Sequence, residues 1–173
     1  MKAIVTLLIV GIIGFIQPQN SYSQKKKNRK EKQQIEFAET LKLVESGSFI
    51  FVPDRAFPQG GRSIDLTTNY GFLKVTDEKA ESDMPYFGRA FQASYGSGEG
   101  GMKFKGEMLE QKMEINEKKK SIEYTFEVRD KDYYKIRMTI SYGGSTSVGI
   151  TSNNRSFINY NGKISVPEEE NEE

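Results

Sequence analysis

Apolar and polar residues alternate through the C-terminal part of the chain, from about Met113 to Val166. Residues 121–128 and 134–142 are the clearest examples, and Asp130–Asp132 form a short link between them. This period of two predicts antiparallel strands with one packed face and one face in water. The polar positions of the first strand are acidic where those of the second are basic, which favours pairing of these two strands.

Three dipeptides in the same region favour tight turns, because their residues readily adopt positive φ angles. They are Gly143-Gly144, Asn153-Asn154 and Asn161-Gly162. The last is the strongest hairpin signal of the three. We therefore expect an antiparallel meander that turns at each of these positions.

The first half of the chain is less regular. Residues 49–52 form a continuous apolar run, which predicts a strand buried on both faces or one lying under a helix. Residues 64–70 alternate, and Gly71 then shifts the apolar phase by one before residues 72–75, as a bulge or bend in a strand does. Residues 102–105 predict another short strand.

One segment has a helical period instead. From Glu31 to Ser46 apolar residues recur at steps of three and four, and Gly47 follows, where a left-handed cap favours glycine. The predicted fold class is mainly β (α+β). We expect about eight or nine antiparallel strands in a curled sheet or barrel-like meander, with sandwich closure as the alternative, and one N-terminal amphipathic helix across a face or open end of the sheet.

The chain begins like an exported protein. Lys2 precedes an apolar run, Ala3–Ile16, that is shorter than the roughly 20 residues needed to span a bilayer. Small residues at Ser21 and Ser23 suit cleavage by signal peptidase, so residues 1–23 are expected to be a signal peptide, with an uncleaved N-terminal anchor as the alternative. The mature protein is then expected in the periplasm or outside the cell, without a transmembrane segment.

Charge blocks of opposite sign flank the remaining sequence. Residues 24–30 are basic and residues 167–173 are acidic, and both are expected to be disordered, solvated extensions. The alternatives are a membrane or polyanion tether at the first and a docking tail at the second. Residues 31–166 are predicted to form a single β-rich domain, since a mature chain of about 150 residues has an ordinary single-domain size.

Composition excludes several classes of chemistry. The chain has no Cys, His or Trp, which excludes disulfides, thiolate nucleophiles, imidazole-based triads and ordinary zinc sites. Its 25 Lys and Arg balance 24 Asp and Glu, whereas proteins that bind nucleic acid are usually strongly basic.

The spacing of the acidic residues and glycines along the chain does not indicate an enzymatic site. It singles out no carboxylate pair and no oxygen-ligand metal site, and the Gly-rich residues 96–101 precede a strand, not the helix that a phosphate loop needs. We predict no catalytic residue, metal, cofactor or nucleic-acid partner. Whether the protein is an enzyme stays open, and the composition weighs against it.

Arginines and aromatic residues gather in segments 53–62 and 82–101, and Tyr70 lies between the two segments. Arg offers a planar fork for carboxylate or phosphate, and Tyr offers an apolar face with a polar tip, so together they suit a pocket for a small anionic or aromatic ligand. The predicted ligand-binding residues are Arg55, Arg62, Tyr70, Tyr86 and Arg89. In the alternative interpretation the aromatic residues belong to the core and the arginines form ion pairs. Those pairs are Arg55 with Asp54 or Asp83, and Arg62 with Asp65.

Five stretches of sequence are distinctive together: FVPDRAFP at 51–58, GGRSIDL at 60–66, YFGRA at 86–90, GMKF at 101–104 and SNNRSF at 152–157. They resemble the bacterial domain-of-unknown-function family 4251, small exported proteins of a single domain, and the resemblance extends from about residue 36 to 164. It implies an exported antiparallel β domain with a leading helix, and it implies no catalytic residues.

The function predicted from these observations is a non-catalytic module that binds a small molecule. The alternative is an interaction or structural module of the cell envelope, whose partner is an envelope protein that meets an exposed sheet edge or the charged ends. A hydrolase that uses carboxylates is a distant third. The fold alone selects none of the three.

Overall fold

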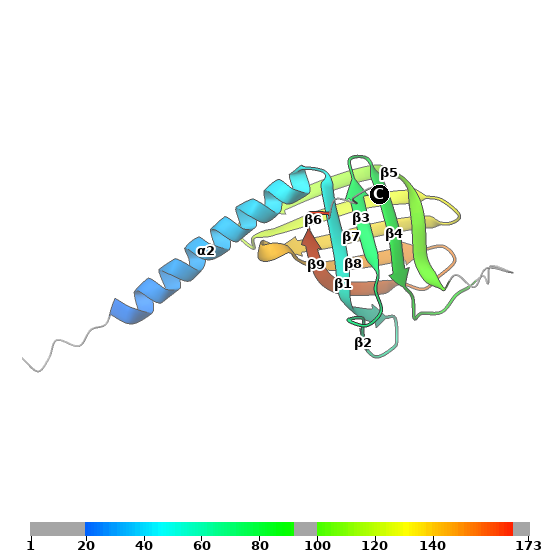
Figure 1. The fold of residues 1–173 in the computed structure, drawn as a ribbon, viewed down its shortest axis with the longest axis horizontal. Coiled ribbons are helices and arrows are strands. Elements are labelled where there is room, and N and C mark those ends of the chain that lie inside the picture. Colours follow the sequence, from blue (N-terminus) through cyan, green and yellow to red (C-terminus); the bar gives the residue numbers. More distant parts are fainter. Residues whose placement is uncertain (1–19, 92–99, 168–173) are drawn as a thin grey trace, which may run out of the picture. The chain divides into compact units, whose positions relative to one another are not determined.

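The computed structural model describes residues 20–91 and 100–167, with side chains from residue 27 onward (Figure 1). The chain divides into two units, residues 1–32 and 33–173, and every strand belongs to the second. The described part contains one α-helix, nine strands and one short 3-10 turn. These are α2 (Asn20–Glu45), β1 (Ser48–Pro58), β2 (Ile64–Asp65), β3 (Phe72–Thr76), β4 (Lys79–Pro85), β5 (Gly101–Asn116), β6 (Ser121–Arg129), β7 (Tyr133–Ser141), η2 (Tyr142–Gly144), β8 (Ser145–Ser152) and β9 (Ile158–Ser165).

Eight of the strands close into an antiparallel barrel. The order runs β1-β3-β4-β5-β6-β7-β8-β9, and β9 then pairs with β1 from Ile50↔Ser165 to Pro58↔Ile158. The remaining strand, β2, is attached to β1 through Arg55 and Ala56. The structure thus confirms the predicted mainly β class and its curled, barrel-like sheet.

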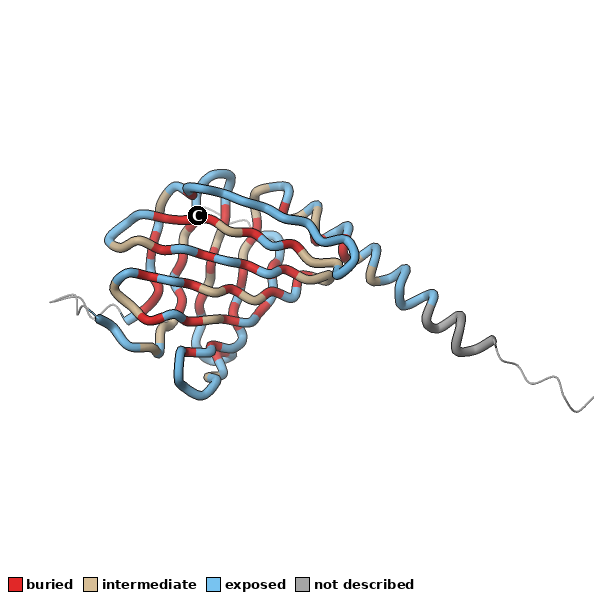
Figure 2. The backbone as a smooth tube through the Cα atoms, turned by 180° about the vertical axis from the view of Figure 1, so that it is seen from behind, coloured by how far each residue is buried: buried red, intermediate tan, exposed pale blue. Residues whose placement is uncertain are grey.

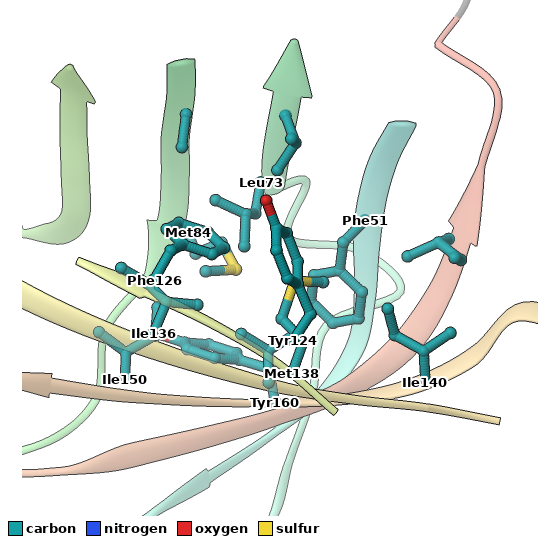
Figure 3. Close-up of a cluster of buried hydrophobic side chains, with 14 of the residues drawn as sticks. Phe51, Leu73, Met84, Tyr124, Phe126, Ile136, Met138, Ile140, Ile150 and Tyr160 are labelled. Atoms are coloured by element: carbon teal, nitrogen blue, oxygen red, sulfur yellow. The ribbon is translucent and has the colours of Figure 1, made fainter. Parts of the chain in front are cut away.

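Buried and more exposed residues alternate along the strands (Figure 2), and the inward-facing side chains form an apolar cluster inside the barrel (Figure 3). Large residues such as Phe51, Phe126 and Ile136 have no exposed surface. An eight-stranded barrel is just wide enough for side chains of this kind. The candidate binding surfaces in the described part of the protein therefore lie on its wall and end loops.

Buried polar groups inside the barrel are hydrogen-bonded. The Tyr160 hydroxyl donates to the Pro85 carbonyl oxygen at 2.8 Å, and the Ser82 hydroxyl donates to the Met102 carbonyl oxygen at 2.9 Å. Burial raises the pKa of the Tyr160 phenol, which keeps its proton on the donor. Within the described residues, no fully buried side-chain nitrogen or oxygen lacks a partner.

The C-terminal half of α2 packs against the barrel. Phe37, Thr40 and Val44 are buried at steps of three and four, whereas Ile35 is 60% exposed, so the predicted apolar stripe is only partly buried. The Gln33 side chain donates to the Tyr142 hydroxyl at 3.0 Å and holds the helix near the turn between β7 and β8. The predicted glycine cap is confirmed, because Gly47 has φ +68° and is the second residue after the end of the helix at Glu45.

Helix α2 begins at Asn20, well before the predicted start at Glu31. Residues 24–30, predicted to be a disordered extension, are helical in the structure. Lys, Arg and Gln dominate this stretch, and they lose little side-chain freedom in a helix. Residues 1–19, which make up most of the expected signal peptide, and residues 168–173 of the acidic tail lie outside the described residues.

Export from the cytoplasm stays a prediction. Among the described residues, no helix combines the length and the apolar character that crossing a membrane requires.

The turn predicted at Asn161-Gly162 is wrong, since both residues lie in the middle of β9. Gly162 pairs with Pro53, next to a bulge in β1. A Cβ atom on Gly162 would stand 2.1 Å from the Val52 carbonyl oxygen and 2.8 Å from the Pro53 Cα. Glycine is therefore required here because two backbones approach closely, not because the chain turns. The other two dipeptides do lie in connections, in η2 and between β8 and β9.

The strand predicted over residues 64–70 is mostly a loop. The Asp65 carboxylate accepts a hydrogen bond from the Thr67 N–H at 2.9 Å, and the Asn69 N–H donates to the Leu66 carbonyl oxygen at 2.9 Å. A short polar side chain that bonds its own backbone in this way offers an alternative to the strand ladder. Only residues 64–65 remain a strand.

Burial alternates along residues 49–52, although the sequence there is continuously apolar. Phe49 and Phe51 have no exposed surface, whereas Val52 is 39% exposed. The strand is therefore buried on its inner face and partly exposed on its outer face, as expected for a barrel strand.

Replacing Gly162 with Ala should weaken the closure of the barrel. The added methyl group meets backbone atoms of β1, which have little freedom to move, so we expect a loss of stability at the upper end of the about 1–3 kcal/mol that overpacking costs. Urea denaturation followed by fluorescence or circular dichroism measures this. Gly100→Ala is the control, since nothing lies within 4 Å of its added Cβ. Equal stability of the two variants would contradict the close approach of β1 and β9.

Candidate functional site

The five predicted ligand-binding residues lie on different parts of the second unit. Arg55 is on the outer wall, in β1. Arg62 and Tyr70 flank β2 in exposed loops, and Tyr86 and Arg89 follow β4. The hollow that includes Arg55 is lined by none of the other four. The hollow at Arg55 therefore does not bring the five described residues together.

Tyr86 and Arg89 join two loops. The Tyr86 hydroxyl donates to the Arg89 carbonyl oxygen at 2.7 Å and lies 2.8 Å from the Ser156 hydroxyl, which accepts the Arg89 N–H at 3.1 Å. The Arg155 guanidinium lies over the Tyr86 ring, 5.2 Å from its centre. These contacts tie the loop after β4 to the loop between β8 and β9. The Arg89 side chain itself is exposed, and a ligand-binding role for both residues stays a prediction.

Arg55 forms an ion pair, as the alternative interpretation expected, but with Asp65 and not with Asp54 or Asp83. The Arg55 Nη2 and Asp65 Oδ2 atoms are 3.7 Å apart, and both side chains are about half exposed. An exposed pair of this kind contributes little to stability. The pair therefore leaves Arg55 free to exchange partners.

A trough runs along the outer face of β8. Two adjoining hollows of about 270 and 380 Å³ form it, and they share Thr139 and Ser147. Its main side chains come from β1, β7, β8, β9 and the residue before β9. They are Asp54, Arg55, Lys135, Arg137, Thr139, Ser141, Ser145, Ser147, Gly149, Thr151, Phe157, Asn159 and Asn161, and the one carboxylate, Asp54, lines the larger hollow alone. We call this surface the β8 trough.

Strand register explains why the wall is hollow there. The outward residues of β8 are short, and Ser147 lies between Thr139 of β7 and Asn161 of β9. One step along, Gly149 lies between Arg137 and Asn159. Since directly paired residues share a face of the sheet, long side chains on β7 and β9 stand on either side of a low floor.

Gly149 and Phe157 form the apolar end of the floor. A Cβ on Gly149 would lie 3.0 and 3.1 Å from two atoms of the Phe157 ring, so the ring covers the glycine closely. Phe157 is nevertheless 43% exposed, and its ring is available to a ligand. Beside it, the Asn159 amide donates to the Ser147 hydroxyl at 3.0 Å, which holds both polar groups in place.

The trough is electropositive at this end. The residues lining the smaller hollow include two cations, Lys135 and Arg137, and no carboxylate. Lys135 is bound to Glu127 at 3.1 Å, and the Glu127 side chain is only 8% exposed. Among the residues described by the structure, no acidic group lies within ion-pair distance of Arg137. Arg137 is therefore the cation available to a ligand.

The described residues support a metal or catalytic centre less than they support a binding surface. Within residues 27–91 and 100–167, no group of three or more acidic side chains could hold a metal ion. Glu127 is a buried carboxylate paired with Lys135 of the trough, and hydrogen bonds from Tyr133 and Lys135 hold its pKa below the usual value for Glu. A carboxylate stabilised in its charged form is a poor general acid.

Sequence analysis identified Arg55 by residue type but missed Arg137, Asn159 and Asn161. Their alternation does place them on the outer face of their strands. The missing information was the order of β7, β8, β9 and β1, which brings them side by side.

Replacing Tyr86 with Phe should loosen the junction of the two loops. The variant loses the hydroxyl that bonds the Arg89 carbonyl, so we expect a loss of about 1–2 kcal/mol in unfolding free energy. Faster hydrogen exchange is expected at the Ser156 amide, which donates to the same carbonyl at 2.9 Å. Tyr70→Phe is the control, since Tyr70 is 79% exposed. A similar loss in both variants would argue against the junction.

Acid should destabilise the protein partly through Glu127. The pKa of Glu127 is lower in the folded state, so the charged carboxylate stabilises the fold at pH values above its unfolded pKa of about 4.3. This stabilisation is lost as the pH falls through the pKa of Glu127 in the folded protein. Glu127→Gln should therefore lose less stability than the wild type between pH 5 and pH 3. Urea denaturation at both pH values measures this, with Glu123→Gln on the same strand as the control. An unchanged acid dependence in Glu127→Gln would contradict the assignment.

Comparison with known proteins agrees with this fold. A family model described as a domain of unknown function (DUF4251) matches residues 31–164. The structure is similar to the crystal structure of a DUF4251 family protein from Bacteroides eggerthii DSM 20697, with a TM-score of 0.59 and 16% sequence identity, over 78% of this chain and 89% of that chain. No curated protein matches. Because the family model spans well over half of the sequence, the chain belongs to the DUF4251 family.

Proposed function

We propose that the β8 trough binds a small hydroxylated anion, such as a sugar acid, without transforming it. The observation that carries the proposal is the smaller hollow, where Arg137 and Lys135 stand beside a floor of short side chains and no carboxylate is present. A site with this charge favours an anion, and its shallow polar floor favours hydroxyl groups.

Arg137 is the anchor for the anionic group. Its guanidinium presents parallel N–H donors that match the two oxygens of a carboxylate. Gly149, its direct neighbour on β8, has no side chain, and the Phe157 ring that covers this glycine lies beside Arg137. Lys135 adds positive charge nearby, although its ammonium group is already bound to Glu127.

The other side chains of the trough suit a sugar ring. Thr139, Ser147 and Asn161 lie in one row across three strands and offer both donors and acceptors to ligand hydroxyls. The exposed Phe157 ring offers a flat apolar surface to the C–H face of a sugar.

Arg55 extends this row on β1, since it pairs with Asn161. Of the five residues predicted from the sequence, it is the one that this proposal uses. Its exposed ion pair with Asp65 can be exchanged at little cost for a contact with a ligand.

Titration with glucuronate tests the proposal. In the ¹⁵N-labelled protein we expect saturable shifts of the amide signals of Arg137, Gly149 and Asn159 at millimolar glucuronate, and weaker binding of uncharged glucose. Arg137→Gln should weaken the binding of glucuronate about tenfold or more, equivalent to about 1.4 kcal/mol. Arg129→Gln is the matched control, because it removes the same charge from the neighbouring strand β6.

Each outcome decides between the interpretations. Saturable shifts that persist in Arg129→Gln and weaken in Arg137→Gln support the trough. Equal affinities of the two variants would place the anion elsewhere. Unchanged trough signals at millimolar glucuronate would reject the sugar-acid assignment.

A further inference from the structure

Strand β5 extends beyond its neighbour β4. Residues 101–107 pair with β4, and the Met108 N–H donates to the Glu78 carbonyl oxygen at 2.7 Å. From Leu109 to Asn116 the pairing described for β5 is with β6 alone. Every residue from 109 to 119 is exposed, and this stretch forms the long pale blue margin in Figure 2. We call residues 109–116 the β5 edge.

A bulge separates the β5 edge from the first half of the strand. The register with β6 shifts between Leu109 and Lys112, and Glu110 has φ +50°, which is uncommon for a residue with a side chain. A bulge bends the strand and increases its twist. The edge therefore leaves the line of β4, and its second row of backbone N–H and C=O groups faces away from β6.

A free strand edge selects its partner by backbone chemistry. Only another extended chain can satisfy a row of alternating donors and acceptors at strand spacing. The apolar side chains Met113 and Ile115 are 41% and 44% exposed, although they pair with the buried Tyr124 and Ile122. They therefore lie on the inner face of the sheet, and an added strand would cover their open side.

Beyond the bulge, from Lys112 to Asn116, the outer face of the β5 edge carries one charge of each sign. Lys112 and Glu114 lie on either side of Met113, with Lys112 Nζ and Glu114 Oε1 2.6 Å apart. The two charges attract within one chain, but the same spacing makes the edge complementary to itself when a second copy runs in the opposite direction.

We propose that two copies of the protein pair through the β5 edge, antiparallel and centred on Met113. In this register Lys112 faces Glu114 of the partner subunit, and Glu114 faces the partner's Lys112. Met113 meets its own counterpart on the two-fold axis. Such an interface is isologous and closes as a dimer.

Charge also disfavours the two nearest registers that keep like faces together. Centring the pair on Lys112 would place that residue opposite the partner's Lys112, and centring it on Glu114 would oppose two carboxylates. Like charges directly opposite each other destabilise a strand pair. Registers shifted by a single residue would join the inner face of one sheet to the outer face of the other.

Sedimentation equilibrium of the full chain measures the association. We expect a dimer that dissociates on dilution. Glu114→Lys and Lys112→Glu should each weaken it about tenfold or more, because each variant places like charges opposite each other. A mixture of the two variants should associate as well as the wild type, since opposite charges then meet again. Glu45→Lys, a charge change at the exposed end of α2, is the control.

Cross-linking tests the register directly, because the chain has no Cys of its own. Met113→Cys places two thiols beside the two-fold axis, within reach of a disulfide after a small adjustment. Leu109→Cys is the control, since its thiols would be far from each other in this register.

Oxidation should therefore give a covalent dimer with Met113→Cys and not with Leu109→Cys. A monomer at every concentration would overturn the proposal. So would a dimer that neither Glu114→Lys weakens nor Met113→Cys cross-links.

Discussion

The pairing of β1 with β9 is the contact on which the rest of the structure depends. It joins the first and last strands over almost the full length of β1 and converts an open meander into a barrel. The closure encloses the apolar side chains of both strands, and it also brings Arg55 next to Asn161 on the outer wall. The core and the candidate site therefore rest on the same hydrogen-bonded seam, although they use opposite faces of the sheet.

The packed interior and the open trough have one cause in the sequence. Inward positions of β6 and β7 are large apolar or aromatic residues, whereas the outward positions of β8 are Ser, Gly and Thr. Large residues inside leave little room for a ligand in an eight-stranded barrel. Small residues outside lower the wall between two rows of longer side chains, which places the candidate site on the outer surface.

Features set by near neighbours in the chain could be predicted from the sequence. The strands at residues 121–128 and 134–141 follow from alternation alone, and the glycine after α2 follows from cap chemistry. Gly162 could not be interpreted correctly in this way. The dipeptide Asn161-Gly162 has the composition of a turn, and the physical reason for its glycine is the backbone at Val52, which is remote in the sequence.

In the candidate site too, some features follow from the residues themselves and others depend on segments that are remote in the sequence. Arg55 has the residue type of a ligand contact, but its neighbours on the wall depend on which strands meet. Tyr86 has an equally suitable side chain, but its hydroxyl donates to the Arg89 carbonyl oxygen of its own loop. Residue type therefore identified groups able to bind, whereas strand order and register determine which of them face a common space.

The separation of β1 and β9 along the chain also has a kinetic consequence. Each hairpin from β3 to β9 can form from neighbouring residues, but the seam needs residues 50–58 and 158–165 together. Contacts between distant parts of a chain slow folding, because the loop must lose its entropy before the contact is gained. A ribosome or a translocation pore releases this chain from one end, so the barrel stays open until β9 has emerged. Its apolar inner face is exposed to other chains for that time.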